Sequence, residues 1–352
     1  MTAAKTNPGN YFEDFRLGQV LRHASPRSVT TGDAAVYMSL YGPRFAVQSA
    51  DTFASAIGYP RSPLDDLIVF HIVFGKTVPD ISLNAVANLG YAECRFLRPV
   101  YPGDTLAASS EVIGLKETSS RDTGIVYVRS KGLNQTGATV LEFVRWVMVR
   151  KRDKAAPAPE PVVPTLADRV DPAMIGAAVP PIDLGSYDFA AAGAPYRWQD
   201  YAVGERIDHA DGMTLEEAEH QIATRLYQNT AKVHFNQHTE GQGRFGRRLV
   251  YGGVVISLAR ALSFNGLANC FHIAAINGGR HVAPCFAGDT VYAWSEVLEK
   301  AELPGRNDIG ALRLRLVGLK NRTPAGFPRL TASGGYEDGV VLDLDFWTVL
   351  PR

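Results

Sequence analysis

The chain has few cysteines and no excess of charge of one sign. Three cysteines in 352 residues (Cys94, Cys270 and Cys285) are too few and too scattered for a disulfide framework or a cysteine-based zinc site. This usage favours a reducing, cytoplasmic compartment. The 36 Lys and Arg residues balance the 36 Asp and Glu residues, and a neutral chain is a poor nucleic-acid binder because phosphate neutralisation supplies much of that affinity.

Long apolar runs are also missing. The N-terminal stretch MTAAKTNPGNYFEDF has no apolar signal core, and no run approaches the ~20 residues that a membrane span requires. One of the longest runs, Gly252–Ala259, ends at Arg260. Secreted, membrane-spanning and nucleic-acid-binding classes therefore lose support, and the length predicts a globular protein of about two domains.

The sequence repeats itself. FEDFRLGQ (12–19) aligns with WQDYAVGE (198–205) at an offset of 186, and RPVYPGDTLAASSEV (98–112) aligns with APCFAGDTVYAWSEV (283–297) at an offset of 185. Trp146 and Trp347 correspond only if the second half carries an insertion. A Pro- and Ala-rich stretch separates the copies, and prolines favour extended surface structure. We predict repeats at 1–154 and 184–352, joined by a surface linker at 155–183.

Each half has the same order of predicted elements. A short helix (31–40 and 215–227) comes first, and an apolar helix follows (67–78 and 253–264). Alternating runs rich in β-branched and aromatic residues end the half, for example 105–112, 125–130 and 140–149. An apolar helix is buried when an antiparallel sheet wraps it. The prediction is an α+β fold in which each half curls a sheet around one helix and the halves pair sheet edges.

The candidate catalytic residues are concentrated in one segment, LYQNTAKVHFNQHTEGQGRFGRRLVYGGVVISLARAL (226–262). A helix N-terminus presents unpaired N–H groups, and the Gly252-Gly253 pair allows a ligand to approach the backbone closely. A thioester carbonyl that becomes an enolate needs such donors. A neutral histidine such as His234 moves protons near pH 7.

This segment resembles the signature of the MaoC-like family of R-specific enoyl-CoA hydratases and dehydratases. The family's catalytic histidine falls on His234, its Phe-Gly pair on Phe245-Gly246, and its Val-His-Gly on Val250-Tyr251-Gly252. The resemblance implies a double hot-dog of two antiparallel sheets, each wrapped around a long central helix. It also implies an acyl-CoA substrate, a backbone oxyanion donor at Gly252, substrate contacts from Tyr251 and Gly253, and a homodimer. No metal or other cofactor is implied, since CoA is part of the substrate.

The chain departs from the family pattern at one important position. The family has a catalytic Asp five residues before the histidine, where this sequence has Asn229. In the first half, the offset of 186 places Pro43 and Gln48 at the two positions. We therefore expect chemistry in the second half, with the first half shaping the pocket. Asn229 is expected to hold water, and Glu240 or His238 to be weaker candidates for the missing acid.

Within this superfamily, the whole chain most resembles members that dehydrate β-methylmalyl-CoA to mesaconyl-CoA. That substrate carries a free carboxylate, for which arginine is suited. The cations that we consider for it lie in both halves: Arg44, Arg61, Lys232, Arg244, Arg247 and Arg248. Each of them can instead be solvated or contact the phosphates of CoA.

Two alternatives stay open. The first is that the chain hydrates another enoyl-CoA, such as a steroid side-chain or medium-chain ester, and this alternative predicts a long apolar channel as the pocket. The second is that the chain is a non-catalytic hot-dog subunit that binds acyl-CoA or stabilises an active partner.

Overall fold

The computed structural model describes residues 5–352. The predicted N-terminal repeat begins at residue 1, so its first four residues lie outside the described part of the chain. The first half contains the following elements: β1 (Val20–Ser28), α1 (Thr31–Tyr41), α2 (Ala46–Ser49), α3 (Asp51–Ala56), α4 (Asp66–Thr77), β2 (Ala85–Phe96), β3 (Thr105–Glu117), β4 (Thr123–Leu133) and β5 (Thr139–Arg150). The second half contains α5 (Phe189–Ala192), β6 (Arg206–Thr214), α6 (Glu217–Leu226), η5 (Lys232–His234), α7 (Gln237–Glu240), α8 (Gly252–Leu262), α9 (Phe264–Leu267), β7 (His272–His281), β8 (Thr290–Glu302), β9 (Ile309–Lys320) and β10 (Val340–Pro351). Short 3-10 and π-helical turns also occur at Phe12–Asp14, Val78–Ser82, Pro172–Met174 and Trp198–Asp200.

The elements repeat with the offsets read from the sequence. β6 begins 186 residues after β1 (206 − 20), α8 begins 186 after α4 (252 − 66), and β8 begins 185 after β3 (290 − 105). β10 begins 201 residues after β5 (340 − 139), because the connection between β9 and β10 is longer than that between β4 and β5. The predicted insertion therefore lies between β9 and β10, and Trp146 and Trp347 occupy equivalent places.

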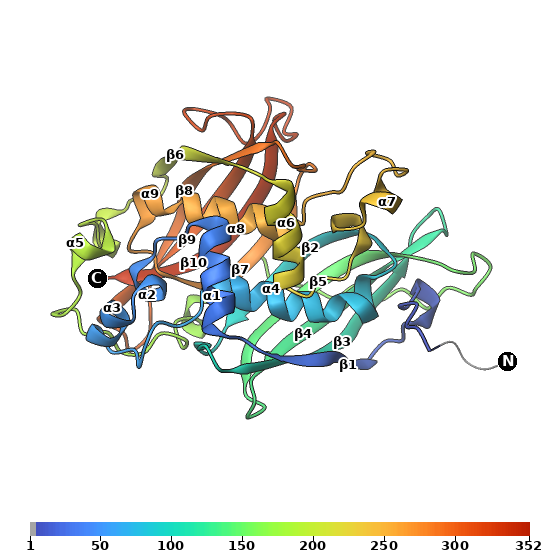
Figure 1. Ribbon diagram of the computed structural model, residues 1–352, viewed down its shortest axis with the longest axis horizontal. Helices are drawn as coiled ribbons and strands as arrows, with labels where there is room; N and C mark the ends of the chain where they lie inside the picture. The colour runs from blue at the N-terminus through green and yellow to red at the C-terminus, as the bar shows by residue number, and fades with distance from the viewer. Residues whose placement is uncertain (1–4) are drawn as a thin grey trace.

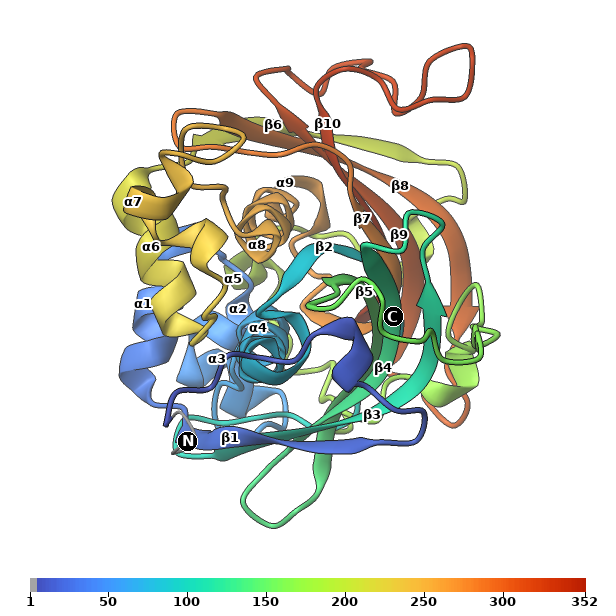
Figure 2. The ribbon, with the colours of Figure 1, turned by 90° about the vertical axis from the view of Figure 1, so that its right-hand side faces the viewer.

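All ten strands form one antiparallel sheet. Its order is β1-β3-β4-β5-β2-β7-β10-β9-β8-β6, so the halves join where β2 pairs with β7. Figure 2 shows the sheet curving around α4 and α8, which lie side by side on its concave side, with His71 of α4 3.2 Å from the Ser257 hydroxyl of α8. The expected α+β double hot-dog is confirmed, with its two sheets continuous through this edge-to-edge pair.

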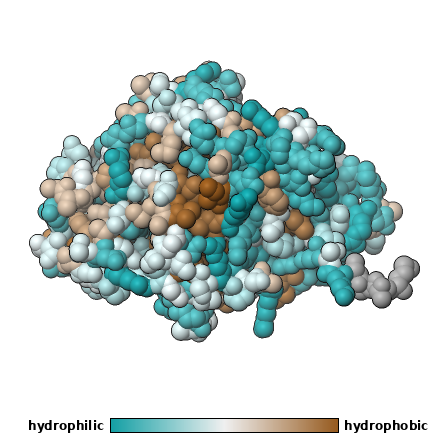
Figure 3. Space-filling view, in the orientation of Figure 1, coloured by the Kyte–Doolittle hydropathy of each residue, from teal (hydrophilic) through white to brown (hydrophobic). Residues whose placement is uncertain are grey.

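The two central helices are buried because the sheet and the other helices surround them. Every residue from Leu67 to Thr77 of α4 is buried, and so is every residue from Gly253 to Leu262 of α8. Their side chains belong to one hydrophobic core that spans both halves. Apolar side chains also gather in the middle of the face shown in Figure 3, over the region of α1, α6 and the central helices.

The segment 155–183 is more than a surface tether. Val170, Ile175, Val179 and Ile182 are buried in a second hydrophobic cluster that also contains Trp347, and the Trp347 indole N–H donates to the carbonyl of Val170 at 3.0 Å. The division into 1–154, 155–183 and 184–352 stays our proposal. Within residues 5–352, no helix is long and apolar enough to cross a membrane.

Candidate active site

Asn229 lies where the chain leaves α6 and turns toward η5. The preceding residue, Gln228, has a left-handed φ of 53°. Asn229 is only 5% exposed, and its side-chain oxygen accepts from the backbone N–H of Ala231 at 3.0 Å. This bond fixes the orientation of the side-chain amide, so its NH₂ group is available to donate to an acceptor. The backbone of this turn also packs against α4, where a Cβ on Gly75 would lie 2.0 Å from the carbonyl oxygen of Tyr227.

His234 ends η5 with one ring nitrogen already committed. Its Nδ1 lies 2.9 Å from the carbonyl oxygen of Leu249, so Nδ1 carries the proton and donates. Nε2 is thereby left with its lone pair. The pKa of His234 is lowered to about 4, chiefly by burial and also by His220 and His281, while the Leu249 carbonyl opposes the shift. The ring is therefore neutral near pH 7 and suited to accept a proton at Nε2.

Gly252 is the first residue of α8, and no side chain caps that helix. A Cβ at this position would lie 2.3 Å from the ring of His281, which packs directly against the helix start. His281 Nε2 lies 3.3 Å from the hydroxyl of Tyr91, a residue of the other half that β2 brings next to β7. Burial lowers the pKa of His281 to about 4, so this ring is also neutral.

Tyr251 and Gly253 flank Gly252 and belong to the packing of the site. The Tyr251 hydroxyl lies 3.3 Å from Nδ1 of His71 on α4, and its ring centroid lies 5.4 Å from that of His234. A Cβ on Gly253 would lie 2.6 Å from the ring of His71. His71 is fully buried, and its pKa is lowered to about 3 by burial and by His281. Both glycines make room for imidazole rings as well as for a ligand.

The cations predicted to bind the substrate carboxylate contact other groups or lie at the surface of the protein. Arg44 stacks on Phe264, which lies beyond the far end of α8 from Gly252. The guanidinium of Arg61 contacts the Pro102 carbonyl. The remaining cations are placed as follows: Arg248 pairs with Glu217 and Gln221, exposed Arg247 stacks on Phe286, exposed Arg244 stacks on Phe245, and Lys232 is exposed.

The candidates for the missing acid lie on α7. His238 is exposed and Glu240 is half-buried, and the helix they share belongs to an excursion between η5 and α8. Figure 1 shows α7 on the outside of the molecule, beyond α6. Neither side chain is tied by a hydrogen bond or ion pair to Asn229 or His234 in the described chain, so their assignment stays a prediction without structural support.

Several residues of the site were not predicted from the sequence. Tyr91, His71 and Arg145 come from the first half, and they reach the site through the β2–β7 pairing and the contact of α4 with the α6–η5 turn. For His281 the sequence gives only a weak indication of a place in the site, because it closely follows the Gly278-Gly279 pair. His220 on α6 is 1% exposed, and it helps to lower the pKa of His234.

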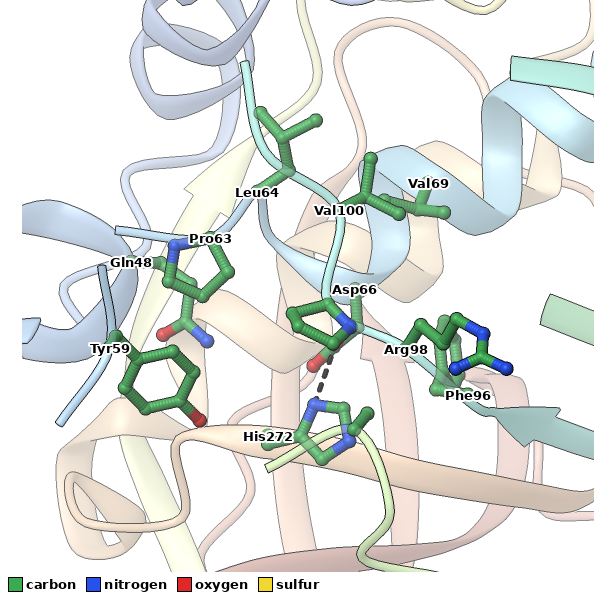
Figure 4. Close-up of a pocket in the computed structure, with 12 residues that line it drawn as sticks. Gln48, Tyr59, Pro63, Leu64, Asp66, Val69, Phe96, Arg98, Val100 and His272 are labelled. Carbon is green, nitrogen blue, oxygen red and sulfur yellow. Dashed lines mark ion pairs between the residues drawn. The ribbon is translucent and has the colours of Figure 1, made fainter. Parts of the chain in front are cut away.

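The equivalent place in the first half holds different chemistry. Asp66 begins α4 where Gly252 begins α8 (252 − 66 = 186), and its carboxylate pairs with His272 Nδ1 at 2.8 Å. Gln48, at the position of His234, donates to the carbonyl of Phe271 at 2.7 Å. Figure 4 shows these residues around a pocket, with the Asp66–His272 pair drawn as a dashed line. We favour the second half as the reactive one, because in the first half the Asp66 carboxylate is already bonded to His272 and to the backbone N–H of Ile273.

Fold and site together define a class. A MaoC domain protein from Chloroflexus aurantiacus superposes with a TM-score of 0.97 at 61% identity, covering 99% of both chains. A conserved hypothetical protein of Mycobacterium tuberculosis with a double hotdog fold superposes with a TM-score of 0.73 at 26% identity, covering 98% of this chain and 99% of that one. The molecule is thus a MaoC-like double hot-dog protein.

Sequence comparisons give the particular family. The family model described as mesaconyl-CoA hydratase matches residues 2–329. The chain is 62% identical to beta-methylmalyl-CoA dehydratase of Chloroflexus aurantiacus, over 99% of both sequences. It is 60% identical to mesaconyl-CoA hydratase of Cereibacter sphaeroides, over 99% of this chain and 100% of that one. The chain belongs to the mesaconyl-CoA hydratase family.

Proposed function

We propose that this protein is a hydro-lyase that interconverts β-methylmalyl-CoA with mesaconyl-CoA and water. The observation that carries this proposal is the position of His234, which is neutral and holds a free Nε2 beside the uncapped N-terminus of α8. The family match over nearly the whole chain supports the substrate.

The reaction in the dehydration direction removes a proton from the α carbon and a hydroxyl from the β carbon. The thioester oxygen accepts a hydrogen bond from the backbone N–H of Gly252, which stabilises the enolate. His234 Nε2 takes the α proton, the Cα–H electron pair becomes the Cα=Cβ bond, and the Cβ–O bond breaks. The imidazolium then gives its proton to the leaving hydroxyl, so that water leaves from the same face. Because the pKa of His234 is about 4, its protonated form is a strong acid for that second step.

Asn229 orients the departing or attacking water. Its side-chain oxygen is held by Ala231 N–H, so its NH₂ group donates to the water oxygen. An amide in place of the family's Asp also avoids a negative charge beside the carboxylate of the substrate.

The proposal also covers cofactors, the cellular compartment and the oligomeric state. The steps above use only side chains and backbone of this chain, and we propose that no cofactor beyond the CoA of the substrate takes part. Within residues 5–352, no group of three or more His, Cys, Asp or Glu side chains is arranged to hold a metal ion. We further propose that the protein is cytoplasmic, because its three cysteines are free and buried. We also propose that it forms a homodimer, on the basis of its resemblance to other hot-dog proteins.

The test is a hydration assay on the purified protein with mesaconyl-CoA, followed by loss of enoyl-thioester absorbance. The wild type is expected to hydrate mesaconyl-CoA, and H234A is expected to lower kcat by roughly 10²–10⁴, the usual contribution of a general acid–base group. Q242A, an exposed position in the same excursion, is the matched control and should keep wild-type rates. Near-normal turnover of a folded H234A would contradict the assignment.

The two alternatives give different results in the same assay. An enzyme for another enoyl-CoA would show a higher kcat/KM for a medium-chain enoyl-CoA than for mesaconyl-CoA. A non-catalytic subunit would show no turnover alone and would gain activity only with a partner protein.

A further inference from the structure

Arg145 is a buried cation without a carboxylate partner. It lies in the middle of β5 and is 0% exposed. Its Nη2 donates to the hydroxyls of Thr77 at 2.7 Å and Ser82 at 3.3 Å, whereas Nε and Nη1 have no partner in the described part of the chain. A charged group that is buried in a protein is normally paired with an opposite charge. The guanidinium therefore keeps unused donors for an anion.

Other arginines of the sheet are paired in the ordinary way. Arg129 meets Glu93 at 2.7 Å, Arg313 meets Asp345 at 2.7 Å, and Arg95 meets Glu142. In contrast, burial lowers the pKa of Arg145 to about 10, and the groups that oppose this shift are the hydroxyls of Tyr91 and Tyr251 rather than any acid. The sheet thus supplies carboxylates to these half-buried arginines and none to fully buried Arg145.

The duplicated half shows that the fold does not require a charge at this position. β5 and β10 correspond at an offset of 201, which aligns Trp146 with Trp347 and Arg145 with Phe346 (346 − 145 = 201). Phe346 is 0% exposed. An apolar ring therefore fills the same place in the second half, so packing alone does not explain the arginine in the first.

The guanidinium lies close to the proposed active site. Tyr91 stands directly opposite Arg145 on the neighbouring strand, so that the two side chains share a face of the sheet. The hydroxyl of Tyr91 reaches His281, which packs against Gly252. Tyr91 and His281 therefore link Arg145 to the start of α8, where the thioester oxygen is expected.

A second series of contacts leads from Arg145 to Asn229. The guanidinium carbon lies 4.2 Å above the ring centroid of Phe74, and that ring lies 5.9 Å from the ring of Tyr251. The next residue of α4, Gly75, touches the backbone of the turn that carries Asn229. Arg145 is thus connected through Phe74 and Gly75 to the turn that carries Asn229, and through Tyr91 and His281 to Gly252.

A second buried cation stands on the same turn of α4. Lys76 is 2% exposed, and its ammonium group donates to the Ser25 carbonyl and to the Gln228 side chain. Burial and the neighbouring Arg27 lower its pKa to about 8. Like Arg145, Lys76 has no ion pair with a carboxylate in the described part of the chain, so two buried cations near the C-terminal end of α4 lack an acidic partner.

We propose that Arg145 binds the free carboxylate of the acyl group and selects CoA esters of dicarboxylic acids. This inference rests on the proposed function and adds the residue that sets its specificity. In β-methylmalyl-CoA the carboxylate and the hydroxyl are attached to the same β carbon. A group that fixes the carboxylate therefore also turns the hydroxyl toward His234 and Asn229.

The test compares mesaconyl-CoA with tiglyl-CoA, in which a methyl group replaces the carboxylate on the same carbon skeleton. In R145M, kcat/KM for mesaconyl-CoA should fall by about 10²–10³, because the carboxylate loses its charge-assisted partner. The value for tiglyl-CoA should stay within a factor of about three or rise. An equal loss on both substrates, with the fold intact, would overturn the proposal.

The control is another buried arginine that stacks on a phenylalanine. Arg260 is 4% exposed and lies 3.8 Å above the ring of Phe45, but Asp65 and Asp66 are near it. R260M should change kcat/KM for both substrates by the same factor. If R145M fails to fold, R145K decides: a tenfold or greater rise in KM for mesaconyl-CoA alone supports the proposal, and equal changes on both substrates overturn it.

Failure of the proposed function looks different from failure of this inference. A wild-type protein that does not hydrate mesaconyl-CoA contradicts the proposed function. A wild type that hydrates mesaconyl-CoA and tiglyl-CoA equally well supports a hydratase but overturns the role of Arg145.

Discussion

At the scale of single residues, the site depends on which atom of each side chain is already committed. His234 Nδ1 is held by a backbone carbonyl and Asn229 Oδ1 by a backbone N–H, which leaves Nε2 and the amide NH₂ for the substrate. The spacing of the sequence predicted both residues and Gly252. It did not reveal their hydrogen bonds, because Leu249 and Ala231 contribute only backbone atoms, which carry no residue-specific signal.

The N229D substitution tests whether the NH₂ group of Asn229 is the part of the side chain that acts on the substrate. An aspartate keeps the acceptor for Ala231 N–H but loses the NH₂ donor and brings a negative charge toward the carboxylate of the substrate. We expect kcat for mesaconyl-CoA to fall by roughly 10²–10³, as for loss of a positioned donor, with little change in the thermal midpoint. Wild-type turnover in N229D, measured by the same absorbance assay, would show that Asn229 is only a turn residue.

At the scale of elements, the site is made by contacts between the two halves. The offsets of 185 and 186 predicted the central helices and the strands. They did not show that β2 would bring Tyr91 to His281 or that α4 would touch the turn at Asn229, because these pairs are about 150 to 190 residues apart. Arg145 was missed for the same reason.

Gly75 tests the contact of α4 with the Asn229 turn. Helix propensity alone predicts that Ala would stabilise α4 by up to about 1 kcal/mol. A Cβ there would lie 2.0 Å from the backbone oxygen of Tyr227, so G75A should instead destabilise the protein by about 1–3 kcal/mol and lower kcat. Gly32 on α1 is the control, because its added Cβ has an ordinary contact at 3.4 Å. A stabilised G75A, measured by urea unfolding, would contradict the contact.

At the scale of the whole molecule, the fold holds four histidines neutral, of which His71 and His209 are buried and His234 and His281 are half-buried. Burial lowers the pKa of His209, His234 and His281 to about 4 and that of His71 to about 3, below the ordinary value near 6.5. The sequence predicted the duplicated architecture through its repeat. It did not predict this burial, because a histidine in the sequence carries no sign of whether the shared core covers it.

These histidines make stability depend on pH with a definite sign. Between pH 6.5 and about 4 the unfolded chain binds protons that the folded chain does not, so the free energy of unfolding falls as pH falls. Each histidine contributes up to about 1.4 kcal/mol per pH unit. Asp65, whose pKa burial raises to about 6, acts in the opposite direction but is one group against four. Urea midpoints should drop clearly between pH 7.5 and 5.5, and equal midpoints would argue against four histidines whose pKa is lowered in the folded protein.

The central claim is that chemistry belongs to the second-half site that His234, Asn229 and Gly252 form with residues of the first half. A crystal structure with methylsuccinyl-CoA, a saturated analogue that does not react, tests it most directly. The account predicts the thioester oxygen on the Gly252 N–H and the β carbon between His234 Nε2 and the Asn229 amide. An acyl group bound instead beside Asp66 and His272, in the pocket of Figure 4, would contradict it.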